Sequence, residues 1–273
     1  MSLIPYLSVF KVTGEDSTRF LNAQLAANTA ELQTGQCRFA AYCSARGQVI
    51  ALLLVCRGVD EYLVCAHAGL ASVVVDRLRT YVLRDRVQLH YPCDMRVLGL
   101  PRTATDQYSG HVYVPAKLPF GYAFSDQSTA ANHMPTPWKE MELTHGVTWV
   151  QPDSSERFIP QMLGFDELGA VSFNKGCYPG QEIIARTRYL GKLKRKPVLV
   201  RVSGAGEIPP GSGVLLNSAG QDVEAEVADC AVVNDGRYVL AFLVARLEPG
   251  EEVSALSLAG DSRPARRLYP DYG

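Results

Sequence analysis

The sequence predicts an α+β protein whose C-terminal part forms a small β-barrel. Two observations lead to this prediction. Between residues 49 and 100, apolar runs and turn signals follow the order strand, strand, helix, strand, strand, which is typical of a small ferredoxin-like α+β unit. From residue 197 onward, five short β-branched runs are separated by Gly, Pro or Asn-Asp-Gly, which is typical of a small barrel.

Composition limits the classes of protein that this chain can belong to. Its 273 residues can bury a substantial core in two or three domains, and 47% of them are hydrophobic. The net charge is −1, so any contact with a nucleic acid requires a local basic patch. The longest dense apolar run, Val49 to Cys56, is far shorter than the roughly 20 residues that span a bilayer. Met1 to Pro5 has no basic region, and this predicts no signal peptide.

The seven cysteines favour reduced thiols in a cytoplasm. Their number is odd, no two of them form C-x-x-C, and nothing in their spacing argues for a permanent metal site. Core packing is the favoured interpretation for Cys56 and Cys65, because both lie in strongly apolar runs.

Apolar periodicity places the elements of the N-terminal part. Strands are expected over residues 7–12, 37–43, 49–56, 62–66, 87–90 and 95–100, and helices over residues 18–25 and 70–82. Residues 101–137 resist assignment, except for a short strand at Val112–Val114 and a loop over 125–137.

The C-terminal part starts with two short helices and continues as strands. The helices are expected over residues 138–143 and 181–189, with Trp149 packed in a strand over 147–150. The barrel strands are expected over residues 197–203, 214–217, 223–233, 237–245 and 252–258. Asn234-Asp235-Gly236 predicts a hairpin turn between the third and fourth of them.

The most informative chemical feature is the segment KGCYPGQE over residues 175–182, named here the KGC loop. Gly176 and Gly180 allow backbone conformations that other residues avoid, and Pro179 suits a helix start. A helix start and the nearby ammonium of Lys175 both favour an anion, so the thiol of Cys177 should ionise readily. The residues alone leave open whether Cys177 is this reactive thiol or a small buried hydrophobe.

The KGC loop and Arg186 resemble the signature of the YgfZ family, folate-binding relatives of the glycine cleavage T protein that are linked to tRNA modification. The resemblance continues in the FIPQ segment at 158–161, in AVSF at 170–173, and over residues 12–24 and 35–47. It implies the aminomethyltransferase fold with a ferredoxin-like insertion and a six-stranded C-terminal barrel. The implied domains are residues 1–47 with 133–196, which bind folate, residues 48–132, and residues 197–273.

The resemblance also implies a function and a site. The function is that of an accessory protein that uses tetrahydrofolate and a reactive cysteine to support iron–sulfur cluster assembly or repair, and thereby tRNA modification. The expected partners are a folate and iron–sulfur client enzymes or assembly proteins, and no membrane. Cys177 would act as the thiolate, Lys175 would support it, and the pterin would lie near Trp138. The residue alone leaves open whether Trp138 stacks on the pterin or packs the helix in the core. The remaining cofactor-binding residues are Gly176, Tyr178, Gly180, Gln181, Glu182 and Arg186.

Two departures from the family bear on this function. Where relatives carry a Glu that can bind the pterin, this chain has Thr144, so Glu140, Glu142 or Asp153 would have to substitute. The stretch after Gly47 lacks the acid that the T protein uses in methylene transfer, and this argues against aminomethyltransferase activity. A folate-dependent one-carbon transferase therefore stays the alternative.

A basic run follows the KGC loop and leads to a second alternative. Six cations and no acid lie between Arg186 and Lys196: Arg186, Arg188, Lys192, Lys194, Arg195 and Lys196. They could hold the glutamate tail of a folate or the phosphates of a tRNA, in which case the chain is an RNA-binding module. The alternative without a ligand is that the run is a charged segment exposed to solvent.

Overall fold

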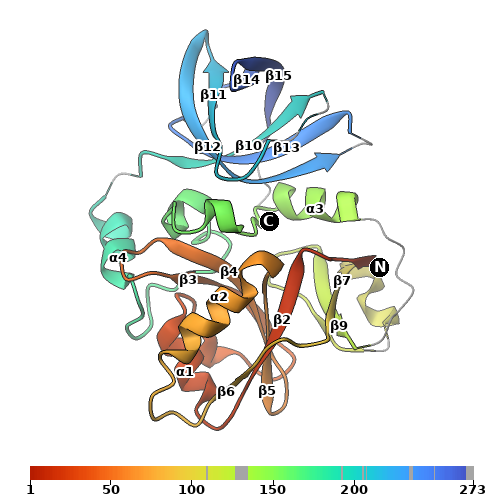
Figure 1. The fold of residues 1–273 in the computed structure, drawn as a ribbon, viewed down its shortest axis with the longest axis vertical. Coiled ribbons are helices and arrows are strands. Elements are labelled where there is room, and N and C mark those ends of the chain that lie inside the picture. The colour runs from red at the N-terminus through yellow and green to blue at the C-terminus, as the bar shows by residue number, and fades with distance from the viewer. Residues whose placement is uncertain are drawn as a thin grey trace.

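The computed structural model describes residues 1–108, 110–126, 135–191, 193–204, 206, 208–233, 236–248 and 250–268. It confirms an α+β fold with three sheets, one of which closes into a barrel. In Figure 1 the barrel lies at the top, helices and irregular chain form a middle layer, and the two open sheets lie below. None of the helices in the described part of the chain is long and apolar enough to cross a membrane.

The five-stranded sheet is antiparallel, with the order β3-β4-β5-β2-β6. Its strands are β2 (Leu7–Thr13), β3 (Cys37–Cys43), β4 (Val49–Arg57), β5 (Glu61–His67) and β6 (Gln88–His90). β4 is buried from Val49 to Cys56, as its continuous apolar run requires of a central strand covered on both faces. Helix α2 (Ala68–Arg79) packs on β2, β4 and β5 through its apolar stripe, and α1 (Ser17–Gln24) follows β2.

The four-stranded sheet has the order β1-β7-β9-β8. Its strands are β1 (Ser2–Leu3), β7 (Arg96–Pro101), β8 (Val112–Tyr113) and β9 (Phe120–Ser125). β9 lies in the stretch that resisted assignment from the sequence, because Gly121 interrupts its pattern. A Cβ on Gly121 would lie 2.9 Å from the backbone oxygen of Tyr113, so the close approach of β8 explains the glycine.

The middle layer contains α3 (Pro135–Thr144), α4 (Gln181–Tyr189) and irregular chain between them. Short 3-10 turns occur here and elsewhere: η1 (Thr29–Glu31), η2 (Arg102–Gln107), η3 (Pro152–Ser154) and η4 (Pro160–Leu163). The strand expected over residues 147–150 is wrong. Val147 N–H donates to the carbonyl of Glu142, and Trp149 N–H donates to the carboxylate of Asp229, so neither backbone group pairs with a strand.

The barrel closes through six antiparallel strands in the order β10-β13-β12-β11-β14-β15. They are β10 (Lys196–Ser203), β11 (Gly213–Ser218), β12 (Gln221–Val233), β13 (Tyr238–Ala245), β14 (Ala255–Leu258) and β15 (Asp261–Leu268). The sequence located five of them. It missed β15, whose Pro264 and three arginines (Arg263, Arg266 and Arg267) hide the strand pattern. Asn234 and Asp235 of the expected hairpin lie outside the described residues.

The division into three domains stays a prediction. The expected boundary after residue 47 falls between β3 and β4, and these two strands pair in one sheet. The second expected boundary, at 132–133, lies outside the described residues, and the third falls where β10 enters the barrel.

Candidate functional site

The KGC loop packs against the turn between β3 and β4. Gly180 precedes α4 with φ of +81°, and a Cβ there would lie 2.5 Å from the carbonyl oxygen of Ser44 and 2.6 Å from the Cα of Gly47. Gly47 has φ of +74° and lies against the side chain of Ile183 in α4. Two glycine-containing segments that are remote in sequence therefore fit together only without side chains.

Replacing Gly180 by Ala should lower the free energy of unfolding by about 2 kcal/mol or more, because the left-handed backbone alone costs about 1–3 kcal/mol. The added Cβ also clashes with the backbone of Ser44 and Gly47. Urea denaturation measures the change. Gly176→Ala is the matched control, since a Cβ on Gly176 meets nothing within 4 Å, and equal stability of the two variants would contradict this packing argument.

Lys175 fastens the KGC loop to the end of α1. Its ammonium donates to the backbone carbonyls of Asn22, Leu25 (2.6 Å) and Ala27 (3.0 Å). Burial lowers the pKa of Lys175 to about 8, whereas three carbonyl acceptors oppose the loss of its proton. The three N–H groups of the ammonium are used in these bonds. Lys175 therefore holds the KGC loop against the end of α1, and its expected support of the Cys177 thiolate stays a prediction.

Cys177 presents its thiol beside α1. It is the exposed one of the seven cysteines, which all lie among the described residues. The thiol borders an open cavity of about 500 Å³ between the loop and the helix. The cavity lining also contains Glu15, Thr18, Arg19, Asn22, Ala23, Ala30 and Gly176. Of the two interpretations that the sequence left open, the structure excludes a buried Cys177.

The other expected cofactor residues of the loop divide by burial. Gly176, Glu182 and Arg186 are exposed, and Gln181 is half-buried. Tyr178 is buried below the loop, where burial raises the pKa of its hydroxyl and the Lys175 ammonium lies 5.2 Å from the centre of its ring. Tyr178 is therefore part of the support of the loop.

Trp138 lies inside the core of the four-stranded sheet. It is 3% exposed, and a Cβ on Gly99 would lie 2.4 Å from its indole ring, so one ring face lies flat on β7. The rings of Phe120 and Tyr122 meet it edge-on at 5.1 and 5.8 Å. Its Nε1–H is buried and has no hydrogen-bond partner among the described residues.

The structure does not bring Trp138 and Cys177 together in one described cavity. In Figure 1, α3 and α4 lie at opposite ends of the middle layer. The thiol and the indole therefore lie in two separate places on the molecule.

None of the three acids expected to replace the missing Glu is a buried and free acceptor. Glu142 is fully buried, but it already accepts from Tyr6 OH (2.6 Å), Tyr122 OH (2.8 Å) and Trp149 Nε1 (2.9 Å). Burial raises the pKa of Glu142, and the charge of Lys139 opposes this shift. Glu140 and Asp153 are exposed. Thr144 uses its hydroxyl on the carbonyls of Glu140 and Met141.

A second buried carboxylate, Asp229 of β12, joins the barrel to the middle layer. Its oxygens accept from the Lys139 ammonium at 2.5 Å, from the backbone N–H of Trp149 and from the Gln151 amide. The backbone N–H of Cys230 is a further donor. Sequence reasoning missed Asp229, although an acid among the apolar residues of a long barrel strand was a usable signal.

The basic run is partly neutralised. Arg188 pairs with Asp166 (3.6 Å), Arg195 with Glu226 (3.3 Å) and Lys196 with Glu248 (3.6 Å). Arg186 and Lys194 are exposed and have no ion pair with another described residue, and Lys192 lies outside the described residues.

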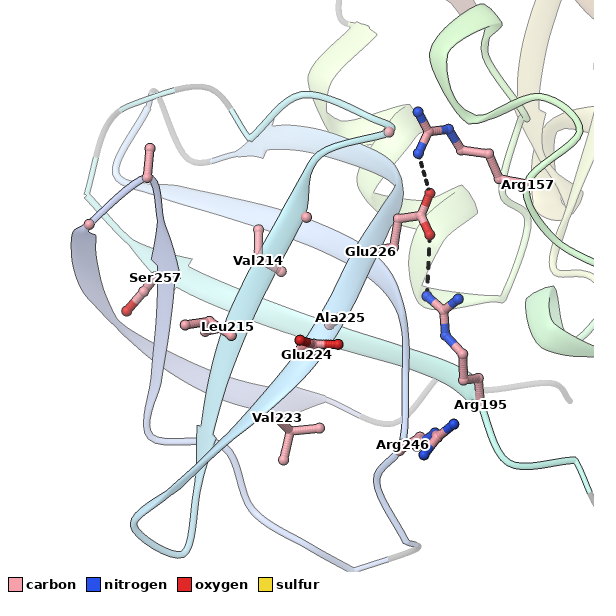
Figure 2. Close-up of a pocket in the computed structure, with 14 residues that line it drawn as sticks. Arg157, Arg195, Val214, Leu215, Val223, Glu224, Ala225, Glu226, Arg246 and Ser257 are labelled. Atoms are coloured by element: carbon pink, nitrogen blue, oxygen red, sulfur yellow. Dashed lines mark hydrogen bonds and ion pairs between the residues drawn. The ribbon is translucent and has the colours of Figure 1, made fainter.

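A groove with three arginines opens on the outside of the barrel, between β11, β12 and the β14–β15 turn. Its volume is about 1130 Å³. Figure 2 shows Glu226 between Arg157 (2.7 Å) and Arg195 (3.3 Å), with Arg246 below them. We name Arg157, Arg195 and Arg246 with this surface the arginine groove. Sequence reasoning found Arg195 only, because the other two are isolated in the chain.

The next two observations concern a metal-binding cluster and an acid on β4. No group of three or more His, Cys, Asp or Glu side chains that could hold a metal ion occurs in the part of the chain that the structure describes. β4, where the T protein's acid was sought, is an unbroken buried apolar strand from Val49 to Cys56.

The chain was compared with known proteins. No family model matches it. The tRNA-modifying protein YgfZ of Shigella sonnei (strain Ss046) is 24% identical over 284 residues, which cover 93% of this chain and 83% of the relative. The tRNA-modifying proteins YgfZ of Escherichia coli O157:H7 (strain EC4115 / EHEC) and Klebsiella pneumoniae (strain 342) are each 26% identical, with the same coverage.

Among solved structures, glycine cleavage system aminomethyltransferase T from Bartonella henselae superposes with a TM-score of 0.70 at 16% identity. The match covers 99% of this chain and 84% of that protein. The resemblance that the KGC loop indicates is thereby confirmed: the chain is similar to the YgfZ proteins over 93% of its length, and it has the fold of aminomethyltransferase T.

Proposed function

We propose that this protein is a cytoplasmic, folate-binding accessory protein of the YgfZ type that supports tRNA modification through iron–sulfur enzymes. The observation that carries the proposal is the presentation of Cys177. An exposed thiol stands beside an open cavity on a loop that Lys175 and Gly180 fix in place. These two anchors hold the thiol in one position beside the cavity.

The chemistry that fits this place is that of a soft nucleophile or ligand. An exposed thiolate can bind iron or sulfide, or attack an electrophile, and the cluster or its components would be cargo of the protein. Arg19 and Glu15 border the same cavity, and both are held in ion pairs, Arg19 with Asp16 and Asp85 and Glu15 with Arg86. The relatives are named tRNA-modifying proteins, and this name is the reason for proposing a role in tRNA modification.

The proposal predicts that Cys177 is alkylated first of the seven cysteines. Iodoacetamide with timed quenching and peptide mapping measures the order. Burial raises the pKa values of Cys43, Cys56 and Cys65, which leaves little thiolate at these positions. Labelling of any other cysteine before Cys177 would contradict the proposed role.

A cellular experiment tests the link to tRNA modification. In cells that lack the protein, a plasmid-borne Cys177→Ser variant should fail to restore thiolated nucleosides in tRNA, whereas Cys230→Ser should restore them. Cys230 is a half-buried barrel cysteine remote in sequence from the loop. Full restoration by Cys177→Ser would exclude the thiol as the working group.

Groups that could hold a folate are present, although the family's acid is missing. The buried Nε1–H of Trp138 lacks an acceptor, and a pterin offers acceptor nitrogens and a carbonyl oxygen. The exposed guanidinium of Arg186 has no ion pair with a described residue and would hold a carboxylate of the glutamate tail. Bound tetrahydrofolate would supply a carrier for a one-carbon unit. The exchange of Glu for Thr144 removes one acceptor for the pterin N–H groups.

Calorimetric titration with reduced tetrahydrofolate tests this part. We expect saturable binding that Trp138→Phe weakens, because the variant keeps an aromatic ring and loses the N–H donor. Thr144→Glu should strengthen binding about tenfold or more, since a hydrogen bond to a charged group contributes about 1.5–3 kcal/mol. Absence of binding by both the parent and Thr144→Glu would remove folate from the proposal and leave the thiol function standing.

An activity assay on the purified protein tests the alternative, a folate-dependent one-carbon transferase. A proton-transfer step requires a titratable group near the reacting atom, and the buried run of β4 offers none. Robust tetrahydrofolate-dependent methylene transfer in a purified assay would favour this alternative over an accessory role.

A second candidate function, direct contact with tRNA, is favoured by the arginine groove. Arg246 of this groove forms no ion pair with a described residue, and the acids Glu224 and Glu226 line the groove beside the arginines. Arg195 also connects the groove to the basic run. Guanidinium groups suit phosphate recognition.

Fluorescence anisotropy with labelled tRNA tests this candidate. We expect binding that weakens as salt rises, and a smaller salt dependence in Arg246→Gln. Arg266→Gln is the control, because Arg266 is exposed on β15 and does not line the groove. No binding at low salt, or an equal effect of both changes, would eliminate the groove as an RNA surface.

A further inference from the structure

Two cysteines face each other across neighbouring strands, remote from the KGC loop. Cys37 opens β3 and Cys56 lies near the end of β4, and the antiparallel register makes them direct partners. The strand register continues without irregularity from this pair to the pair Tyr42–Ala51.

The hydrogen-bond pattern shows which kind of pair they form. Next to the cysteine pair, Arg57 N–H donates to the carbonyl of Gln36, and the Arg57 carbonyl accepts from Gly35 N–H, so both backbone groups of Arg57 point toward the chain that leads into β3. At the other end, both backbone groups of Ala41 point away from β4, because they bond with Ala170 and Ala26. Ala41 and its partner Leu52 therefore form a non-hydrogen-bonded pair. Hydrogen-bonded and non-hydrogen-bonded pairs alternate along an antiparallel ladder. Cys37 and Cys56 lie an even number of residues from that pair, so they form a non-hydrogen-bonded pair as well.

This kind of pair has the dimensions that a disulfide requires. Its Cα atoms are about 4.5 Å apart, within the range of about 4.4–6.8 Å found for disulfides. Directly opposite side chains point to the same face of the sheet. The two cysteines are nevertheless present as free thiols.

The two thiols differ in their access to solvent. Cys56 is fully buried, whereas Cys37 is half-buried on the edge strand of the sheet. Burial, and after it the neighbouring thiol of Cys37, raise the pKa of Cys56. A dissolved reagent therefore meets Cys37 before Cys56, and Cys37 is the cysteine that lies directly opposite Cys56.

We propose that Cys37 and Cys56 are a redox-active dithiol that small disulfides such as oxidised glutathione convert to a cross-strand disulfide. The Cys37 thiolate attacks one sulfur of the small disulfide, whose S–S bond breaks and releases one small thiolate. Cys56 then loses its proton and attacks the Cys37 sulfur, which releases the second small thiol. The protein loses two protons and two electrons, and the small disulfide is reduced to two thiols.

The full-length chain carrying Cys177→Ser tests the proposal without interference from the exposed thiol. After anaerobic incubation with oxidised glutathione, we expect the loss of two titratable thiols without retained glutathione. Non-reducing peptide mapping should then show one cross-link that joins the peptides of Cys37 and Cys56. Dithiothreitol should restore both thiols.

Two further variants make the outcome decisive. Cys56→Ser should trap glutathione on Cys37, because the resolving thiol is gone. Cys65→Ser should still form the cross-link, because Cys65 is buried opposite Leu54 and does not lie directly opposite either member of the pair. Retained glutathione on Cys37 in the presence of Cys56, a cross-link to another cysteine, or no reaction at Cys37 would each overturn the proposal.

Discussion

Asp229→Ala should lower the free energy of unfolding by about 3–5 kcal/mol, because it leaves the buried ammonium of Lys139 without its partner. The Lys139 side chain is 10% exposed and that of Asp229 is fully buried, so water cannot replace the lost contact at low cost. The change also removes the acceptor of the Trp149 N–H and the Gln151 amide. The damage is expected where the barrel meets α3 and the segment after it.

Urea denaturation followed by tryptophan fluorescence measures this loss, since Trp149 is bonded to Asp229 through its backbone. The double variant Asp229→Leu with Lys139→Met is the control. Replacing both members of a buried ion pair by apolar residues is often neutral or stabilising, so the double variant should recover much of the stability lost in Asp229→Ala. A loss in Asp229→Ala below about 1 kcal/mol would show that the pair contributes little to the contact between barrel and body.

Local patterns explain the part of the fold that the sequence predicted. β3 and α4 begin and end where the sequence placed them, and β4 differs by one residue. In each case a run of one periodicity ends at a Gly or at a turn, so the information lies within the segment itself. The elements that the sequence missed, β9 and β15, carry a Gly or a Pro that only the neighbouring strand explains.

The residues of the candidate site could be named from the sequence, but their contacts could not. The KGC loop singles out Cys177, whereas the contacts of Lys175 depend on carbonyls about 150 residues earlier in the chain. The resemblance also singles out Trp138, whose place on β7 depends on Gly99. A single sequence does not show which remote positions are in contact. The fold implied by a resemblance places the backbone more reliably than the side chains.

The second large effect is expected at Glu142. Glu142→Ala removes the acceptor of Tyr6, Tyr122 and Trp149, and each buried donor without a partner costs about 1–3 kcal/mol. We therefore expect a loss of about 4 kcal/mol in the free energy of unfolding, measured by urea denaturation. Glu142→Gln keeps an acceptor oxygen at the same place, and at neutral pH it should lose much less. An equal loss of unfolding free energy in both variants would show that the hydrogen bonds accepted by Glu142 do not contribute to stability.

The dependence on pH separates the charge of Glu142 from its hydrogen bonds. Burial raises the folded-state pKa of this carboxyl above its ordinary value of about 4.5. The folded state therefore holds the proton more tightly than the unfolded chain, and this stabilising contribution is fully present below about pH 4.5 and is lost as pH rises through the folded-state pKa. The amide of the Glu142→Gln variant does not titrate, so that variant lacks this loss. Its stability relative to the parent should improve steadily as pH rises from about 4.5, in urea denaturation series of both proteins. A difference that stays constant across the series would mean that Lys139 and the three donors fully offset the cost of burying the charge.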